Sequence, residues 1–299
     1  AQKVLLFIIL VLYFLVSSSA SAFVPAGAIT PILQWRSFKT EHFEIIYPAK
    51  AEVHAQRIAH SLEQIYVPLQ FEGRTVKRIP IVISTEGAIT NGYAAPAPMH
   101  SNFFLNPLPE PVIENGVDFT LNWIDGLALH EYRHIVQFDN SNYGLGKLLY
   151  FLLGPLGLTY DSFTKPTWYY EGDAILIETA YSNGGRGRLP IFDANLRTLL
   201  AESKIPTYDE AILASLKYPM PSIYQFGYHY VSYGTEHYGA DVWEKISLRK
   251  ARMSGIPGFG NSVKKFTSSN LTQFSEEVLT KRAEQWEEQR NKTVMTEAE

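Results

Sequence analysis

The 299-residue sequence contains no cysteine. Disulfide bonds and a lipoprotein anchor are therefore excluded, and any metal site must use nitrogen and oxygen ligands. Positive charge is not in excess either, because 26 Lys and Arg stand against 30 Asp and Glu. A nucleic-acid-binding surface needs a basic footprint. The composition thus disfavours nucleic acid as a partner.

Apolar runs long enough to cross a membrane are also missing. A transmembrane helix needs about 20 consecutive apolar residues, whereas the run at residues 148–156 is short and is broken by Pro155. We expect this run to pack in the core. Peripheral contact with a membrane surface is the alternative.

The N-terminal apolar run covers residues 4–16, follows Lys3 and precedes an Ala20-x-Ala22 site. A basic start, a short apolar core and small residues at a cleavage site are typical of a secretory signal peptide. We therefore predict that residues 1–22 are a signal peptide and that the protein is exported, to the periplasm or the extracellular space. An uncleaved membrane anchor is the alternative.

The string at residues 130–134 reads H-E-Y-R-H. It lies in segment 121–138, where large apolar residues recur every three to four positions, as in a buried helix. On such a helix His130 and His134 share one face and can bind one zinc ion, with Glu131 beside them. The alternative is a buried helix with two ordinary hydrogen-bonded histidines, because buried polar groups must find partners.

A hydrolytic zinc site usually takes a third protein ligand. The best candidate is Glu171, and Asp173 is the alternative. Both lie in residues 168–181, which read as a second helix. Glu178 lies two turns beyond Glu171 on the same face. We expect it to accept the far N–H of a metal-bound histidine and so to fix that ring.

The start of this second helix carries further signals. Pro166 suits the first turn of a helix, and Thr164 is the expected cap before it. Gly172 costs helical stability relative to alanine, so it should answer a packing demand. We expect its missing side chain to let this helix approach the zinc helix closely.

These residues together resemble a known family. His130-Glu131-x-x-His134 followed by Trp168-x-x-Glu171-Gly172-x-Ala174-x-x-x-Glu178 is similar to the gluzincin metallopeptidases, which include aminopeptidase N and thermolysin-type enzymes. The stretch from about residue 38 to 286 resembles peptidase-like domains that precede TolB-like β-propellers in exported bacterial proteins. Segments 42–48, 91–94 and 224–227 support this likeness. The resemblance implies that a β-propeller follows residue 299.

The resemblance also implies a chemistry. One zinc ion per chain, held by His130, His134 and Glu171, would activate water for the hydrolysis of a peptide or protein substrate. Glu131 would be the general base and later the general acid. Tyr224, in a Tyr-x-x-Gly context, would donate to the oxyanion. Other nearby tyrosines compete for that role: Tyr218, Tyr228, Tyr230, Tyr233 and Tyr238.

One family feature is missing. Aminopeptidases of this clan carry a G-x-M-E-N strand whose glutamate holds the substrate amine, and this sequence has no such string. This absence favours an endopeptidase. Residues 101–105 are expected to form an edge strand that pairs with an extended peptide. Two alternatives stay open: a catalytically idle gluzincin-like scaffold for binding, and a zinc hydrolase that acts on another bond.

The order of the expected elements predicts an α+β fold, with a mixed α/β lobe over residues 36–143, a helical lobe over residues 144–292, and a cleft between them. Within residues 23–299 we expect strands at 42–47, at Val76 with 79–83, and at 103–105, with a helix at 52–69. Residues 85–98 and 107–111 read as loops. Further helices are expected at 193–203, 208–215, 222–238, 241–253 and 271–292.

Overall fold

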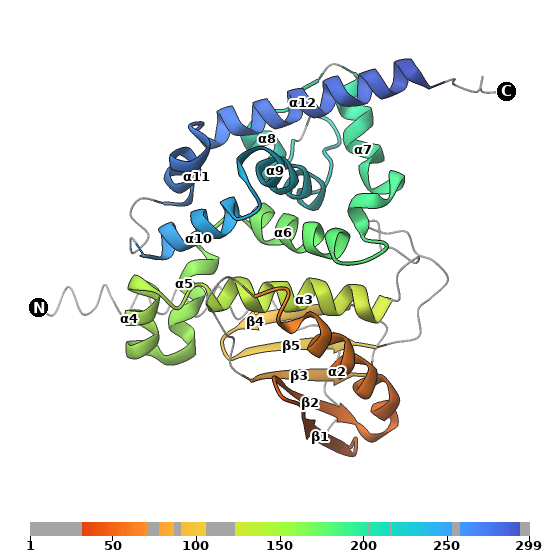
Figure 1. Ribbon diagram of the computed structural model, residues 1–299, viewed down its shortest axis with the longest axis vertical. Helices are drawn as coiled ribbons and strands as arrows, with labels where there is room; N and C mark the ends of the chain where they lie inside the picture. Colours follow the sequence, from red (N-terminus) through yellow and green to blue (C-terminus); the bar gives the residue numbers. More distant parts are fainter. Residues whose placement is uncertain are drawn as a thin grey trace, which may run out of the picture.

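The computed structural model describes residues 32–70, 78–86, 91–105, 123–202, 204–215, 217–252 and 258–293. A small sheet carries helices on one face, and a larger helical body lies beyond them (Figure 1). This arrangement confirms the predicted α+β class. The predicted signal peptide, Val76 and residues 107–111 lie outside the described residues.

The sheet has five strands in the order β1-β2-β3-β5-β4. The central pairs β2–β3 and β3–β5 are parallel, and the outer pairs β1–β2 and β4–β5 are antiparallel. Alternate residues of β2 and β3 are fully buried, because one face of the sheet is covered by helices. The strands are β1 (Trp35–Lys39), β2 (Phe43–Pro48), β3 (Ile79–Ser84), β4 (Asn91–Pro96) and β5 (Met99–Phe104).

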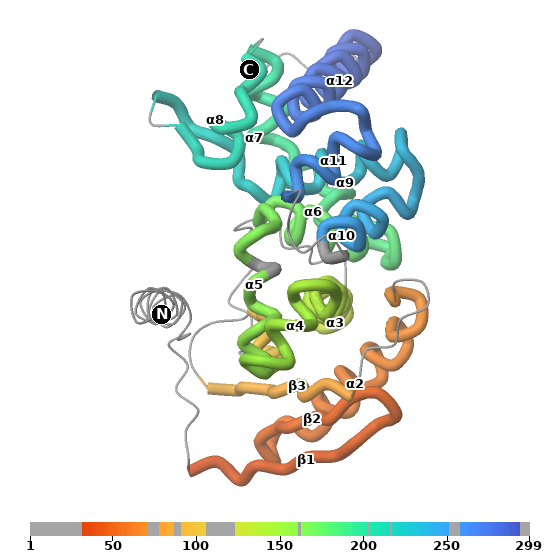
Figure 2. The backbone as a smooth tube through the Cα atoms, turned by 90° about the vertical axis from the view of Figure 1, so that its left-hand side faces the viewer, coloured from red at the N-terminus to blue at the C-terminus, as the bar shows by residue number. Residues whose placement is uncertain are grey.

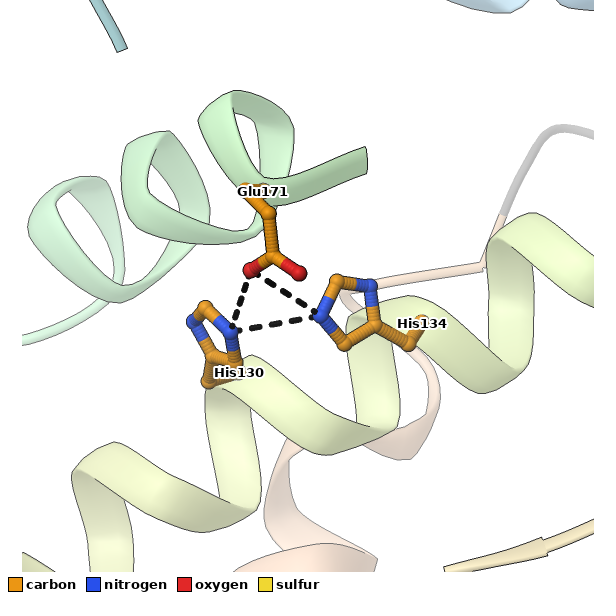
Figure 3. Close-up of side chains that lie close together, drawn as sticks. All are labelled: His130, His134 and Glu171. Carbon is orange, nitrogen blue, oxygen red and sulfur yellow. Dashed lines mark hydrogen bonds and ion pairs between the residues drawn. The ribbon is translucent and has the colours of Figure 1, made fainter. Parts of the chain in front are cut away.

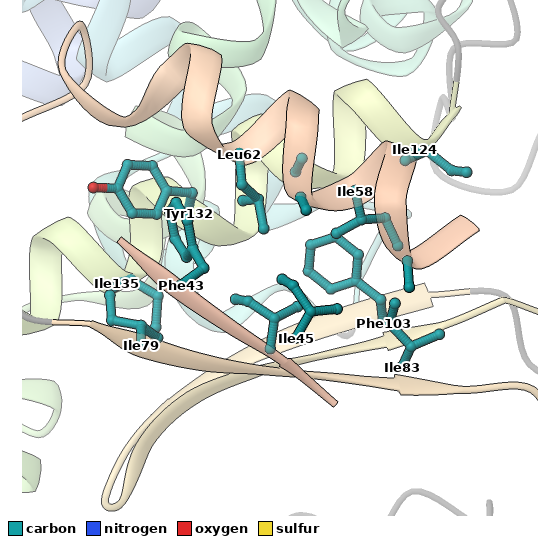
Figure 4. Close-up of a cluster of buried hydrophobic side chains, with 14 of the residues drawn as sticks. Phe43, Ile45, Ile58, Leu62, Ile79, Ile83, Phe103, Ile124, Tyr132 and Ile135 are labelled. Atoms are coloured by element: carbon teal, nitrogen blue, oxygen red, sulfur yellow. The ribbon is translucent and has the colours of Figure 1, made fainter. Parts of the chain in front are cut away.

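Two helices cover this face, α2 (Glu52–Tyr66) and α3 (Trp123–Asp139). Ile58 and Leu62 of α2 project onto Ile45 and Phe103 of the sheet, in the first hydrophobic core (Figure 4). The predicted helix at 52–69 therefore forms but ends three residues early. Burial of the apolar stripe, rather than helix propensity, is the main source of stability for such helices.

Most of the described helices after α5 pack around a second core on the other side of α3. The two views agree that α3 lies between the sheet and α6 (Figures 1 and 2). Trp168 of α6 and Tyr230 of α9 stand at the centre of this second core. The helices are α4 (Gly144–Leu153), α5 (Thr159–Ser162), α6 (Thr167–Ala180), α7 (Pro190–Ala201), α8 (Tyr208–Leu213), α9 (Ile223–Tyr238), α10 (Val242–Arg252), α11 (Phe259–Thr267) and α12 (Leu271–Lys292). The 3₁₀ turns are η1 (Ala49–Ala51), η2 (Gly154–Leu158) and η3 (Arg186–Arg188).

Several predictions of local structure were wrong. The expected loop at 85–98 contains β4, whose glycine, alanines and proline lower strand propensity but are tolerated at a sheet edge. Strand β5, which includes the expected edge residues 101–104, is internal because β4 pairs with its outer side. Helix α11 was not predicted. Thr164 does not cap α6; its hydroxyl donates to the Tyr160 carbonyl instead.

The prediction that the apolar run at residues 148–156 packs in the core was also wrong. Pro155 does end the helical run, since α4 stops at Leu153 and η2 follows. However, most large side chains of the run are exposed rather than packed in the core. Among the described residues, no helix has the length and hydropathy needed to cross a bilayer.

Candidate metal centre

Helices α3 and α6 bring three potential metal ligands together (Figure 3). His130 and His134 lie one helical turn apart on α3, and their Nε2 atoms are 3.2 Å apart. Oε2 of Glu171, from α6, lies 3.3 Å from Nε2 of His130 and 3.6 Å from Nε2 of His134. Ligands bound to zinc at about 2.0–2.1 Å with tetrahedral angles lie about 3.3 Å from one another. The spacing therefore fits one small ion.

The far side of His130 contacts Glu178, two turns along α6 from Glu171. Nδ1 of His130 lies 3.1 Å from Oε2 of Glu178, which can accept its hydrogen. A proton held on Nδ1 makes Nε2 the atom of this ring that can bind an ion in place of its hydrogen bond to Glu171. Both side chains are buried.

The ring of His134 is oriented by an amide instead. The side-chain nitrogen of Gln137 donates to Asp173 and to the Tyr170 carbonyl, at 2.6 and 3.1 Å. The amide oxygen must then face Nδ1 of His134, 2.8 Å away, and accept its hydrogen. Nε2 of His134 is thus left free to bind an ion.

Asp173, the alternative third ligand, does not point to the two rings. Its carboxylate receives two hydrogen bonds from the Arg133 guanidinium, at 2.7 and 3.1 Å, and one from Gln137. Arg133 and Asp173 form a buried pair that joins α3 to α6. Asp173 therefore holds the two helices together, and Glu171 takes the position at the rings.

Arg186 also belongs to the centre, although the sequence did not point to it. Its backbone N–H and its guanidinium donate three hydrogen bonds to the Glu178 carboxylate, at 2.7–3.1 Å. A guanidinium nitrogen also lies 2.7 Å from Nδ1 of His130, where it competes as a donor, because a guanidinium cannot accept the Nδ1 hydrogen. The chain turns back at Gly185, where φ is +94° and a Cβ would lie 2.5 Å from Thr179 Cα. The run of glycines before Arg186 was the one available signal of this reversal.

Charge in this cluster shifts the acidity of its members. Burial and Arg186 lower the pKa of His130, but hydrogen bonds with Glu171 and Glu178 outweigh them and raise it to about 9. Burial likewise raises the pKa of Glu178, yet Arg186 and His130 outweigh it and lower the pKa to about 2. Burial raises the pKa of Glu171 too, but His134 and His130 outweigh it and lower that pKa. The Glu171 and Glu178 carboxylates are therefore anionic at neutral pH, which suits cation binding.

Glu131 is buried beside the two rings without a fixed partner for one of its oxygens. Its Oε2 has no hydrogen-bond partner among the described residues. Burial raises the pKa of Glu131, although His130 and His134 partly offset the rise. A buried carboxylate oxygen without a partner is costly, so such groups usually serve a ligand or a reaction.

Tyr224 lies on the first turn of α9, at the edge of this cluster. Its ring is 5.6 Å from the Arg186 guanidinium carbon. Burial, followed by the charge of Glu171, raises the pKa of its hydroxyl to about 12, so it remains a donor at neutral pH. Four of the five competing tyrosines bond other side chains: Tyr218 bonds Glu210, Tyr230 bonds Ser275, and Tyr233 and Tyr238 bond Glu277.

A close contact between α6 and α9 fixes Glu171 relative to Tyr224. A Cβ on Gly172 would lie 2.2 Å from the backbone of Gly227, and one on Gly227 would lie 2.3 Å from the Trp168 carbonyl. The sequence predicted that Gly172 lets α6 approach α3 closely. Its actual neighbour is α9, because α6 turns that side away from α3 into the second core.

Strand β4 runs along the other side of the cluster. A Cβ on Gly92 would lie 2.9 Å from Leu127 and 3.0 Å from Glu131 Cγ, so only glycine allows this approach to α3. The outer edge of β4 carries no pairing strand in the described sheet.

Comparison of the chain with models of known protein families and with curated proteins gave no match.

Proposed function

We propose that this protein is a zinc-dependent peptidase of the gluzincin type. The observation that supports it best is the convergence of His130, His134 and Glu171 beside the buried, uncommitted Glu131 oxygen. Ordinary hydrogen bonds would account for the two rings and for Glu171, which accepts from them. They would not account for the unpartnered oxygen of the buried Glu131 carboxylate beside the rings.

The donor set favours zinc over hard cations. Two imidazoles and one carboxylate suit zinc, and three protein ligands are the usual number for a catalytic zinc site. Bound there, the ion would act as a Lewis acid that acidifies a water molecule and polarises a carbonyl oxygen. The remaining steps belong to side chains of this protein.

Glu131 is the proposed general base. Its raised pKa makes it a stronger base than a solvated glutamate, and it can take a proton from the attacking water. The same carboxyl can then pass that proton to the leaving amine. Tyr224, protonated at neutral pH, would donate a hydrogen bond to the oxyanion that develops on the scissile carbonyl.

The outer edge of β4 is the proposed site for the substrate backbone. Gly92 holds this strand against Glu131, so an extended peptide paired with β4 would cross the base. This assignment replaces residues 101–105, which are internal. The sequence has no counterpart of the amine-binding glutamate of aminopeptidases, so we propose endopeptidase action.

Glu131→Gln tests the mechanism directly. The variant should bind one zinc per chain as tightly as the wild type, because Glu131 is not a ligand, while turnover falls at least 10²-fold. Glu202→Gln, the same change on the surface, is the matched control and should be fully active. Unchanged turnover in Glu131→Gln would reject Glu131 as the base.

Digestion of a peptide library, read by mass spectrometry, tests the activity and the substrate class. Cleavage should be internal, should stop with a chelator and should return with zinc. A zinc-loaded protein that cleaves no peptide would favour the idle scaffold or a hydrolase for another bond. A stable protein that binds no metal would reject the proposed function altogether.

A further inference from the structure

The chain segment after α3 leaves a group of large apolar side chains exposed. They belong to α4 and η2. Helix α4 lies at the periphery of the molecule beside one end of α3 (Figure 1). No charged residue occurs from position 148 to position 160. We call the exposed set the apolar lip; its members are Leu148, Tyr150, Phe151, Leu152, Leu153 and Leu156.

The lip is carried on a tightly folded hairpin. A Cβ on Gly157 would lie 2.2 Å from the backbone of Leu149, and one on Gly146 would lie 2.0 Å from the Ser141 carbonyl oxygen. Leu158 is buried beneath them. The hairpin also packs on α10 and β4. The apolar side chains are therefore exposed on a part of the chain whose backbone is closely packed.

The direction of these side chains decides which partner fits. Successive residues of an α-helix point about 100° apart. Phe151, Leu152 and Leu153 are 84 %, 63 % and 40 % exposed, so apolar groups emerge on several sides of α4. A second protein surface would cover one side of the helix. A fluid hydrocarbon phase would cover all of them.

Two side chains of α4 suit the polar boundary of such a phase. Lys147 is exposed at the start of the lip, and Tyr150 is partly exposed one turn later. Basic and tyrosine side chains are common at the headgroup level of membranes. Helix α4 has ten residues, about 15 Å of helix, which is half the thickness of a bilayer core.

We propose that the apolar lip inserts into the surface of a phospholipid bilayer as a peripheral anchor. Large contiguous apolar patches on a protein surface mark interaction sites in other proteins. The anchor would hold β4, which contacts η2, close to the bilayer.

The absence of cysteine allows a direct test in the full chain. A single cysteine at Phe151→Cys, labelled with an environment-sensitive nitrobenzoxadiazole dye, is mixed with vesicles of phosphatidylcholine and phosphatidylglycerol. Emission should shift to the blue and rise several-fold. The matched control is Leu213→Cys on α8, which is similarly exposed at 79 % and should show no change. Because the label reports its own surroundings, tethering by another segment does not imitate the result.

A second substitution checks that the lip itself is responsible. Leu152→Asp, added to the labelled Phe151→Cys chain, should reduce vesicle binding measured by the dye at least tenfold, whereas Leu213→Asp should leave it unchanged. No blue shift with vesicles would overturn the proposal. A blue shift without vesicles would also overturn it. If that shift depends on protein concentration, a second copy of the chain covers the lip. If it does not, a segment of the same chain, such as residues 4–16, covers the lip.

Discussion

The two histidines of the centre are held by partners of different charge. His130 faces the carboxylate of Glu178, whereas His134 faces the neutral amide of Gln137. An anionic partner makes a ring a stronger electron donor than an amide does. We therefore expect His130 to contribute more to metal affinity than His134.

Arg186 should control this difference, because it holds the Glu178 carboxylate in place. Arg186→Gln leaves a buried carboxylate without its charge partner, which should cost about 3–5 kcal/mol in the free energy of unfolding. Zinc affinity should fall about 10–100-fold, as for other losses of outer partners. Chelator competition measures the affinity, and denaturant unfolding measures the stability.

The control for this change lies two residues away. Arg188 donates to the Thr179 carbonyl from the same loop and does not contact the centre. Arg188→Gln should leave zinc affinity unchanged. Equal affinities in the two variants would remove Arg186 from the centre.

For single residues, the sequence predicted those members of the centre whose positions depend on spacing within one helix. The positions of His130, His134 and Glu171 follow from helical periodicity within two short segments. Arg186 could not be predicted, because its approach to Glu178 depends on a chain reversal at Gly185. The ion pair between Asp173 and Arg133 could not be predicted either, because each of these charged residues, taken by itself in the sequence, is as compatible with a solvent-exposed position.

Among the elements, the crossing of α6 and α9 is the contact that the candidate centre depends on most. Backbone meets backbone at Gly172 and Gly227, so neither helix can shift without moving Glu171 or Tyr224. A substitution that adds atoms to such a tightly packed contact usually costs about 1–3 kcal/mol, because the surrounding atoms must move.

Gly227→Ala should therefore destabilise the fold by about 1–3 kcal/mol and also weaken zinc binding. The matched control is Gly258→Ala, at the start of α11, where a Cβ would have no atom within 4 Å. Thermal unfolding and zinc titration of both variants provide the measurements. Wild-type zinc affinity in a destabilised Gly227→Ala protein would show that the crossing does not position Glu171.

Element boundaries were predicted less well where the signal is not periodic. Strand β4 has the sequence of a turn, and its pairing with β5 supplies the order that its residues do not favour on their own. The exposed run on α4 was read as core because apolar residues are usually buried. Composition alone gives no indication of which elements will lack a neighbour.

For the whole molecule, proton uptake at the centre competes with metal binding. Burial lowers the pKa of His130, but its hydrogen bonds with Glu171 and Glu178 raise it to about 9, and the pKa of His134 is raised as well. Below pH 9 a metal ion must displace at least one proton. As the pH is lowered from 8.5 to 6.5, zinc affinity should therefore fall about tenfold for each pH unit.

Titration calorimetry in buffers of different ionisation enthalpy measures the protons released. Glu178→Gln removes a partner that raises the pKa of His130, so it should move the loss of affinity to lower pH. Affinity that does not vary with pH in the wild type would contradict the proposed protonation of the ring.

The ligands come from helices that belong to different hydrophobic cores. Helix α3 packs in the first core with the sheet, whereas Trp168 of α6 stands in the second. Between them lies a polar layer that includes the Arg133–Asp173 and His130–Glu178 pairs. Apolar contacts thus hold each half together. Between the halves the polar pairs act beside apolar contacts such as that of Ile177 of α6 with the first core.

A cation bound by His130, His134 and Glu171 would link α3 to α6 and so couple the two halves. The zinc-loaded protein should melt in one calorimetric peak, and stripping the ion should separate the melting of the sheet half from that of the helical half. A single sharp peak after stripping would mean that the polar pairs and apolar contacts couple the two cores without the ion.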